Sequence, residues 1–275
     1  LLRTGYSVAY GQFPADWQGD MITCDFRAHR VVRFKISDQQ AGYVTKEMPD
    51  VLRTTADSFR PIDVKMGPDG ALYVADWSNP IIQHGEVDFR DTRRDKEHGR
   101  IWRITAKGRP LMTRVDFTKQ KNPSLLEMLV SPNGYEVESA RRILVERGEE
   151  KVGRDLNAWT KKQTDEKARL QALWMYQAFN QPQPALLDEL LAASDAHIRA
   201  AATRVLSGWT SPAGQTTPGL TTDDAIARLS LLVTDENPRV RLEAVRALGK
   251  FHTSLAADLA FSVLNKPMDQ FLDYA

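Results

Sequence analysis

The segment 77–99 concentrates side chains that can ligate a metal, move a proton or bind an anion. His84 and His98 carry imidazoles, which can act as general bases near neutral pH, so both are candidate catalytic residues. Asp88 and Asp95 carry carboxylates, which hard cations such as calcium prefer, so both are candidate metal ligands. The spacing of these four residues matches no established metal-binding loop.

The same segment, together with the following Arg100, carries equal numbers of basic and acidic side chains, which can neutralise one another without a ligand. Five basic and five acidic side chains lie close together in the sequence, so a loop held by its own ion pairs is an alternative interpretation. The basic residues are Arg90, Arg93, Arg94, Lys96 and Arg100, and the acidic residues are Glu86, Asp88, Asp91, Asp95 and Glu97. A bound cation would have to compete with the arginines for these carboxylates.

Four further residues are candidates for the same site. Arg60 and Arg100 can hold the carboxylate of a quinone or substrate, and Trp77 can stack on a sugar or quinone ring. Asp63 is a third candidate catalytic residue, although an aspartate at the start of a strand can instead accept backbone N–H groups. Arg100 also has a structural alternative, because Arg30 occupies the equivalent place in a repeated unit without the long segment.

The elements that must position these residues are predicted to be strands. Up to about residue 106, short β-branched and aromatic runs alternate with Gly, Pro and Asp. Residues 19–25 align with 70–76 at an offset of 51, and residues 30–34 align with 100–104 at an offset of 70. A two-strand unit therefore occurs twice, as is typical of β-propeller blades.

The second copy of this unit carries a long connection. Four residues link the two strands in the first copy, but 23 residues link them in the second, an excess of 19. Loops of this length are usually functional. Because alternate turns of an antiparallel meander lie at the same end of the sheet, we expect this loop to fold over the propeller mouth. It should then bring His84, Asp88 and His98 near Arg60.

The remainder of the chain is predicted to be helical. Apolar residues recur at three and four positions, and a unit containing an apolar residue followed by arginine recurs at 168–176, 198–206 and 240–248. Residues 235–249 resemble a HEAT repeat, with Asn237 as the helix cap and Pro238 in the first turn. In this register Ala202 and Ala244 should be buried where helices meet.

These patterns predict a β + α multidomain chain. We expect the C-terminal blades of a β-propeller at 1–106, a linker at 107–122 and an α-solenoid of HEAT-like helix pairs at 123–275. About two blades are fewer than a closed propeller needs, and the chain starts at Leu1 within a strand-rich stretch. We therefore expect it to be a piece of a longer protein.

Composition excludes several other classes of function. With 37 basic and 36 acidic residues, the net charge of +1 argues against nucleic acid as a partner. The sequence has no apolar stretch long enough to span a membrane and no signal segment. Its single cysteine, Cys24, excludes an internal disulfide and a c-type haem motif within the 275 residues.

Residues 59–77 and 98–104 resemble the propeller of the PVC-type (planctomycete) membrane-bound dehydrogenases, which are similar to sorbosone and soluble glucose dehydrogenases. The resemblance continues through 124–129 and 139–148 into the helical part. It implies a periplasmic or secreted protein that uses pyrroloquinoline quinone (PQQ) and calcium. Family members often carry a C-terminal haem domain, which this sequence lacks.

Two hypotheses follow from these patterns. The favoured one is a fragment of an exported, dehydrogenase-like quinoprotein acting on sugars or polyols and inactive by itself. In this mechanism a histidine or aspartate takes a hydroxyl proton while hydride passes to the quinone. The alternative is a non-enzymatic propeller and HEAT scaffold that binds a polysaccharide or, through the solenoid, a partner protein.

Overall fold

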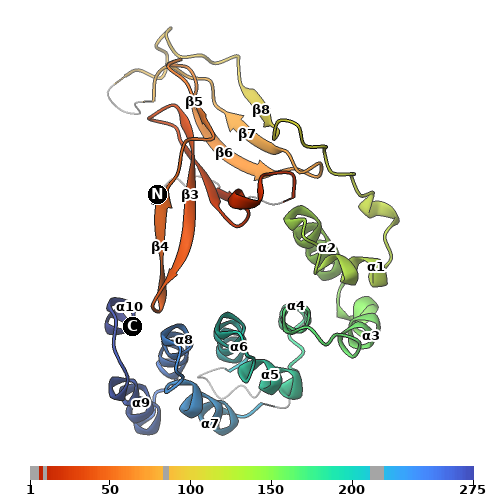
Figure 1. Cartoon of the computed structure of the whole chain (residues 1–275), viewed down its shortest axis with the longest axis vertical. Helices are drawn as coiled ribbons and strands as arrows, with labels where there is room; N and C mark the ends of the chain where they lie inside the picture. Colours follow the sequence, from red (N-terminus) through yellow and green to blue (C-terminus); the bar gives the residue numbers. More distant parts are fainter. Residues whose placement is uncertain (1–5, 9–10, 83–86, 211–219) are drawn as a thin grey trace. The chain divides into compact units, whose positions relative to one another are not determined.

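The computed structural model describes residues 6–8, 11–82, 87–210 and 220–275. Antiparallel sheets form the N-terminal part and helices form the C-terminal part (Figure 1). The chain divides into two compact units. The first comprises Leu1–Ser37, Val44–Thr118 and Ser131–Glu138, and the second comprises Asp38–Tyr43, Lys119–Val130 and Ser139–Ala275.

Two antiparallel sheets build the first unit, except that Asp38–Tyr43, at the tip of one hairpin, belongs to the second unit. One sheet has the order β1-β2-β3-β4, with β5 also paired to β3, and the other has the order β6-β7-β8. The strands are β1 Tyr6–Val8, β2 Met21–Asp25, β3 Arg30–Gln39, β4 Gly42–Glu47, β5 Leu52–Arg53, β6 Pro61–Met66, β7 Leu72–Asp76 and β8 Arg100–Ile104. Within the described residues, the two sheets do not close into a propeller.

The repeated two-strand unit predicted from the sequence is confirmed residue by residue. Asp25 of β2 lies opposite Arg30 of β3, and Asp76 of β7 lies opposite Arg100 of β8. In each copy the arginine also bonds to its aspartate, with N···O distances of 3.2 Å for Arg30 and 3.5 Å for Arg100. The two copies therefore share both register and the ion pair at the strand end.

The core of the first unit follows from the period of two along these strands. Alternate residues of β2 and β7 are buried, so that one face of each strand packs inward. The buried cluster consists of Phe13, Ile22, Cys24, Val31, Phe59, Val64, Leu72 and Val74. Burial, aided by the negative charge of Asp63, raises the pKa of the Cys24 thiol to about 12.

We expect Cys24 of the native protein to resist thiol reagents, because only the exposed thiolate reacts. At mildly alkaline pH, labelling with a disulfide reagent should be at least about a hundredfold slower than in denaturant. Cys24 is the single cysteine, so the measured rate belongs to it alone. Labelling of native protein at the denatured rate would show that β2 does not face a packed core.

Residues 107–118 of the predicted linker belong to the first unit and hydrogen-bond within it. The N–H of Met112 donates to the carbonyl of Asp69 at 2.9 Å, and the Gln12 side chain donates to the carbonyl of Arg109 at 3.3 Å. The short 3₁₀ helix η2 Phe117–Lys119 follows, with the ring of Phe117 against that of Tyr135. The chain between β8 and η2 is thus held by specific contacts.

Paired helices make up the second unit. They are α1 Asn122–Met128, α2 Gly134–Arg147, whose first turn belongs to the first unit, α3 Glu149–Thr160, α4 Glu166–Ala178, α5 Pro184–Leu191, α6 Ala196–Trp209, α7 Thr222–Leu232, α8 Pro238–Leu248, α9 Ser254–Phe261 and α10 Gln270–Tyr274. Helices α4, α6 and α8 form one row, and α5, α7 and α9 form a second row (Figure 1). Beyond Asn122 the described residues contain no strand.

The helix signals predicted from the sequence are confirmed. The side chain of Asn237 accepts the N–H of Arg239 at the start of α8, and Pro238 occupies the first helical position. Ala202 and Ala244 are fully buried, on α6 and α8, which pack against each other. A methyl group at these two positions lets the helix axes approach closely.

The repeated arginines join neighbouring repeats. Each donates to a backbone carbonyl six residues earlier and also reaches a residue of the following repeat. The carbonyl acceptors are Gln163 for Arg169, Ala193 for Arg199 and Asp235 for Arg241, and the later partners are Glu189, Asp235 and Pro267, respectively. These arginines therefore act as cross-links within the helical array.

Arg199→Lys should lower the free energy of unfolding of the helical array by about 1–2 kcal/mol. Arg199 binds Asp235 through two N···O contacts of 2.9 Å, and a lysine has no planar fork to replace them. Urea unfolding followed by far-UV circular dichroism measures the loss. Arg142→Lys is the matched control, because the Arg142 side chain is 70% exposed; an equal loss in both variants would contradict the cross-linking role.

Candidate functional site

Asp76 organises the place where β7 ends and the long loop begins. Its side chain is fully buried and accepts four hydrogen bonds. One carboxylate oxygen accepts the backbone N–H groups of Arg60 at 2.8 Å and Ser78 at 2.9 Å. The other accepts the indole N–H of Trp102 at 3.0 Å and a weaker bond from Arg100 at 3.5 Å. Asp76 therefore fixes the geometry of the loop entrance.

Arg60 binds two turns with one guanidinium group. Its Nε donates to the carbonyl of Asn79 at 2.9 Å and its Nη2 to that of Pro80 at 3.0 Å. Its Nη1 donates to the carbonyl of Phe26, in the turn after β2, at 2.9 Å. Arg60 is 6% exposed, and this burial lowers its pKa. The Nε, Nη1 and Nη2 atoms of Arg60 each donate to a backbone carbonyl, so the N–H groups used in these bonds are not available to bind a ligand.

His29 contacts Arg60 at the same place, although it was not among the candidate site residues predicted from the sequence. Its Nδ1 lies 3.0 Å from the carbonyl of Phe59, and its ring lies 3.3 Å from Nη1 of Arg60. The carbonyl acceptor assigns the proton to Nδ1, so Nε2 can accept from Arg60. His29 lies in the four-residue turn of the first repeated unit. The sequence signal that could have identified His29 is its position in the turn that aligns with the long loop.

The predicted cofactor-binding residues lie around Asp76. The backbone N–H of Trp77 donates to the carbonyl of Arg60 at 2.9 Å, and the Trp77 side chain is 37% exposed. Arg100 donates to the hydroxyl of Ser78 at 2.7 Å in addition to its contact with Asp76. Arg60, Trp77 and Arg100 are thus brought together, and Arg100, whose side chain is 45% exposed, bonds to Asp76 as Arg30 bonds to Asp25 in the other copy.

His98 and Asp95 bond to each other in the loop. The His98 Nδ1 lies 3.0 Å from the Asp95 carboxylate, which also accepts the backbone N–H groups of Glu97 and His98. These N–H groups, with the His98 ring, lower the pKa of Asp95. The Asn79 side chain donates to the carbonyl of Asp95 at 3.3 Å. Asn79 therefore connects the His98 and Asp95 pair to Arg60.

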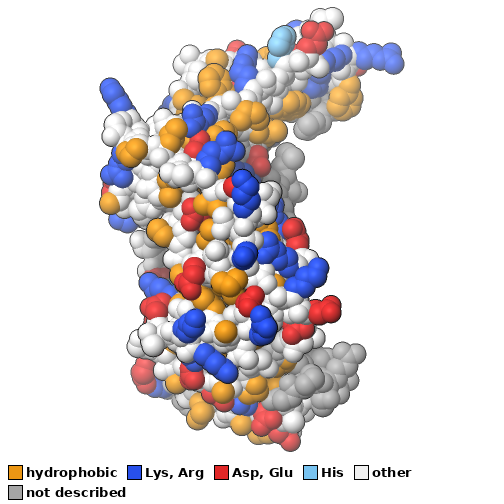
Figure 2. All heavy atoms as spheres, turned by 90° about the vertical axis from the view of Figure 1, so that its right-hand side faces the viewer, with side chains coloured by type: hydrophobic (Ala, Val, Ile, Leu, Met, Phe, Trp, Pro, Cys, Tyr) orange, Lys and Arg blue, Asp and Glu red, His pale blue; other side chains and the backbone are white. Residues whose placement is uncertain are grey.

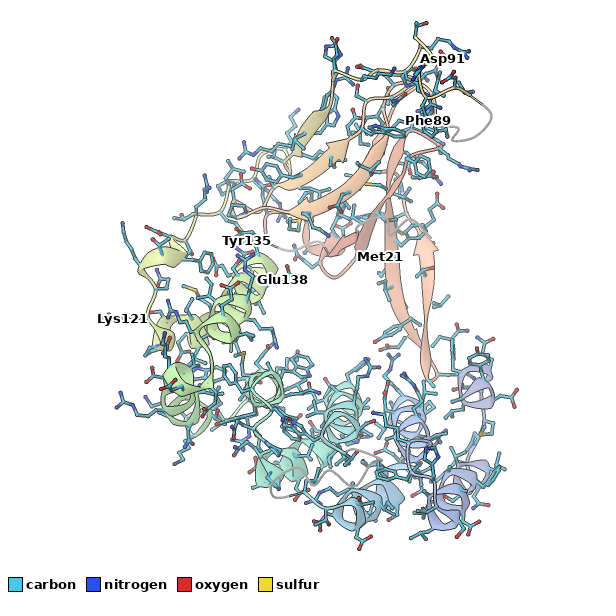
Figure 3. The ribbon with its side chains drawn as sticks, turned by 180° about the vertical axis from the view of Figure 1, so that it is seen from behind. Met21, Phe89, Asp91, Lys121, Tyr135 and Glu138 are labelled. Carbon is cyan, nitrogen blue, oxygen red and sulfur yellow. The ribbon has the colours of Figure 1, made fainter. Side chains whose placement is uncertain are left out.

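The rest of the described loop is also bonded within itself. Asp91 binds Arg93 at 2.7 Å, Asp88 accepts the backbone N–H of Arg90 at 2.7 Å, and Arg94 lies over the ring of Phe89. Figure 3 shows Phe89 and Asp91 beyond one end of the strands. These bonds agree with the alternative of a self-bonded loop.

Two predicted catalytic residues remain, and the structure describes only Asp63. His84 falls outside the described residues. Asp63 follows an irregularity in the pairing of β6, where its carboxylate accepts the N–H of Val64 at 2.9 Å and lies 3.6 Å from the Lys65 ammonium. The Asp63 side chain is 46% exposed.

The donor sets can be tested against the calcium and quinone that the family resemblance implies. Among the described residues, no three His, Cys, Asp or Glu side chains meet in a way that could hold a metal ion. Asp88 and Asp95 instead bind backbone N–H groups of their own turns. The described part of the loop therefore does not fit a calcium site, and we derive no catalytic step through calcium or a quinone.

The molecular surface adds two observations. Basic and acidic side chains are interspersed on the face shown in Figure 2, in keeping with a net charge of +1. None of the described helices is both long enough and apolar enough to cross a bilayer.

Comparisons with known proteins match two parts of the chain. A model of a domain of unknown function, DUF7133, matches residues 5–108, and a model of HEAT repeats matches residues 183–273. No curated protein matches the chain. The C-terminal helical region therefore contains HEAT repeats.

Crystal structures of two engineered proteins are similar to part of the chain. They are 18% and 20% identical, cover 52% of this chain, and are themselves covered over 68% and 69% of their length. Their TM-scores are 0.30 and 0.29, and similarity at that level does not indicate a shared fold.

Proposed function

We propose that this chain is a binding scaffold whose HEAT-type array engages a partner protein. The supporting observation is that helices α4 to α9 form stacked rows, and repeated arginines cross-link them. Stacked repeats of this kind present extended surfaces and are a common basis for protein interaction. In this proposal the strand-rich unit is a second module of the scaffold.

The contacts around Asp76 support a structural role for the loop entrance. The carboxylate of Asp76 and the guanidinium of Arg60 bind groups of the fold itself, and His98 pairs with Asp95. A catalytic base and an anion clamp need side-chain atoms that face the substrate. These side chains instead shape the entrance of a loop that presents Phe89 and Trp77 at the surface.

The test compares turnover with partner binding. We expect the protein supplied with PQQ and calcium to reduce no dye with aldoses or polyols. We also expect it to retain a defined partner protein from the source organism, with a stoichiometry that His98→Ala and Asp63→Ala leave unchanged. Substrate-dependent dye reduction that His98→Ala abolishes would overturn the scaffold proposal.

The second candidate function is oxidation of sugars or polyols by a dehydrogenase-like quinoprotein. Such a protein would be located in the periplasm or outside the cell. The repeated strand unit favours it, because two copies end in an aspartate and only one carries the long loop. This is the pattern of propeller blades with a site on one connection. Here the strands would be C-terminal blades of a propeller completed by further chain.

A further inference from the structure

A groove of about 310 Å³, lined mostly by charged and polar side chains, lies across helices α4, α6 and α8. Gln177 of α4 lines one side, Arg204 and Gly208 of α6 line the middle, and Arg246 and Lys250 line the side of α8. Helices α4, α6 and α8 form the continuous row seen in Figure 1, so the groove crosses two repeat junctions. Its size is at the lower end of the range for binding pockets.

Positive charge exceeds negative charge in this groove. Glu243 is the acidic residue of its lining, against the three cations Arg204, Arg246 and Lys250. The Glu243 side chain is 8% exposed and pairs with Arg204, while Nη1 of Arg246 lies 3.5 Å away. The side chains of Arg204 and Arg246 are 69% and 59% exposed. Both oxygens of this buried carboxylate accept from Arg204, through its Nε and Nη2, so a ligand would bind the remaining N–H groups of Arg204 and those of Arg246.

Stabilisation of helix ends accounts for only part of this arrangement. Lys250 donates to the carbonyl of Ser207 at 2.7 Å, near the C-terminal end of α6, and Arg246 lies in the last turn of α8. Cations at these positions favour the negative end of the helix dipole. Arg204 lies more than one turn before the end of α6, so the dipole does not explain its place beside Arg246.

We propose that this groove binds an acidic peptide segment of the partner protein, with its carboxylates on Arg204, Arg246 and Lys250. The inference rests on the proposed scaffold function and specifies the chemistry of the partner. Arginine guanidinium groups with exposed N–H edges bind carboxylates through two hydrogen bonds. Glu243 neutralises one of the two positive charges of Arg204 and Arg246, and a carboxylate bound between these arginines would neutralise the other.

Gly208 provides a precise way to block the groove. A side chain added there would meet the Nε2 atom of Gln177 at 2.9 Å, and this is the far end of a flexible side chain that can move. Gly208→Glu therefore places a carboxylate in the groove with little disturbance of α6. Gly208→Ala is the matched control, because it adds the Cβ without the charge.

The experiment measures binding of a fluorescein-labelled oligoglutamate peptide to the whole protein by anisotropy. We expect saturable binding that weakens with salt, and affinity that falls at least about tenfold in Gly208→Glu and in Arg246→Glu. Gly208→Ala and Arg142→Glu should stay within about twofold of the unaltered protein. Far-UV circular dichroism checks that each variant keeps its helices.

Three outcomes of the anisotropy experiment would overturn the groove assignment. One is equal binding of oligoglutamate to Gly208→Glu and Gly208→Ala, and another is an equal loss in Arg142→Glu. The third is tighter binding of an oligonucleotide than of oligoglutamate, since that would identify a nucleic-acid surface. If Gly208→Glu still retains the protein partner of the scaffold test, the groove proposal fails while the scaffold proposal stands.

Discussion

Asp76→Ala should reduce the free energy of unfolding of the strand-rich unit by about 3–5 kcal/mol. The substitution leaves the backbone N–H groups of Arg60 and Ser78 and the indole N–H of Trp102 without their acceptor. The measurement is the urea dependence of Cys24 labelling, because this thiol lies in the core of the same unit.

Asp25→Ala is the control at the equivalent position of the first repeated unit. The Asp25 side chain is 36% exposed and binds the N–H of Ala28 and the guanidinium of Arg30. We expect a loss of about 1 kcal/mol there, since water can replace these bonds. Similar losses in the two variants would contradict the special role of Asp76 at the loop entrance.

Ala244→Phe should destabilise the helical array by about 3 kcal/mol, the upper part of the usual range for overpacking. Ala244 is fully buried on α8, which packs against α6, α7 and α9, and a benzyl group there would force α8 away from a neighbouring helix. Urea unfolding monitored by far-UV circular dichroism reports the change. The labelling of Cys24 in the first unit reports whether the effect stays in the array.

Ala227→Phe on α7 is the matched control for overpacking, because Ala227 is exposed. It should cost about 0.5 kcal/mol, the difference in helix propensity between the two residue types. A loss in Ala244→Phe no larger than in Ala227→Phe would mean that the repeat register derived from the sequence is wrong.

The paired strands and the stacked helices follow from local patterns in the sequence. Within the two copies, Met21–Asp25 pairs with residues 30–34 and Leu72–Asp76 pairs with residues 100–104 in the same register. Recurring apolar residues and a terminal aspartate predict that pairing, and both are local properties of the sequence. The cap at Asn237 and the buried methyl of Ala244 are equally local, because helix starts and helix faces depend on residues within a few positions.

The groups that the charged residues near the long loop bind depend on tertiary packing. Arg60 bonds to the carbonyls of Phe26, Asn79 and Pro80, and its neighbour is His29 rather than one of the histidines selected from the loop. Every residue type carries a backbone carbonyl, so these acceptors leave no mark in the residue pattern. Their positions depend on the paths of two turns that are distant in sequence, and those paths exist only once the sheets have packed.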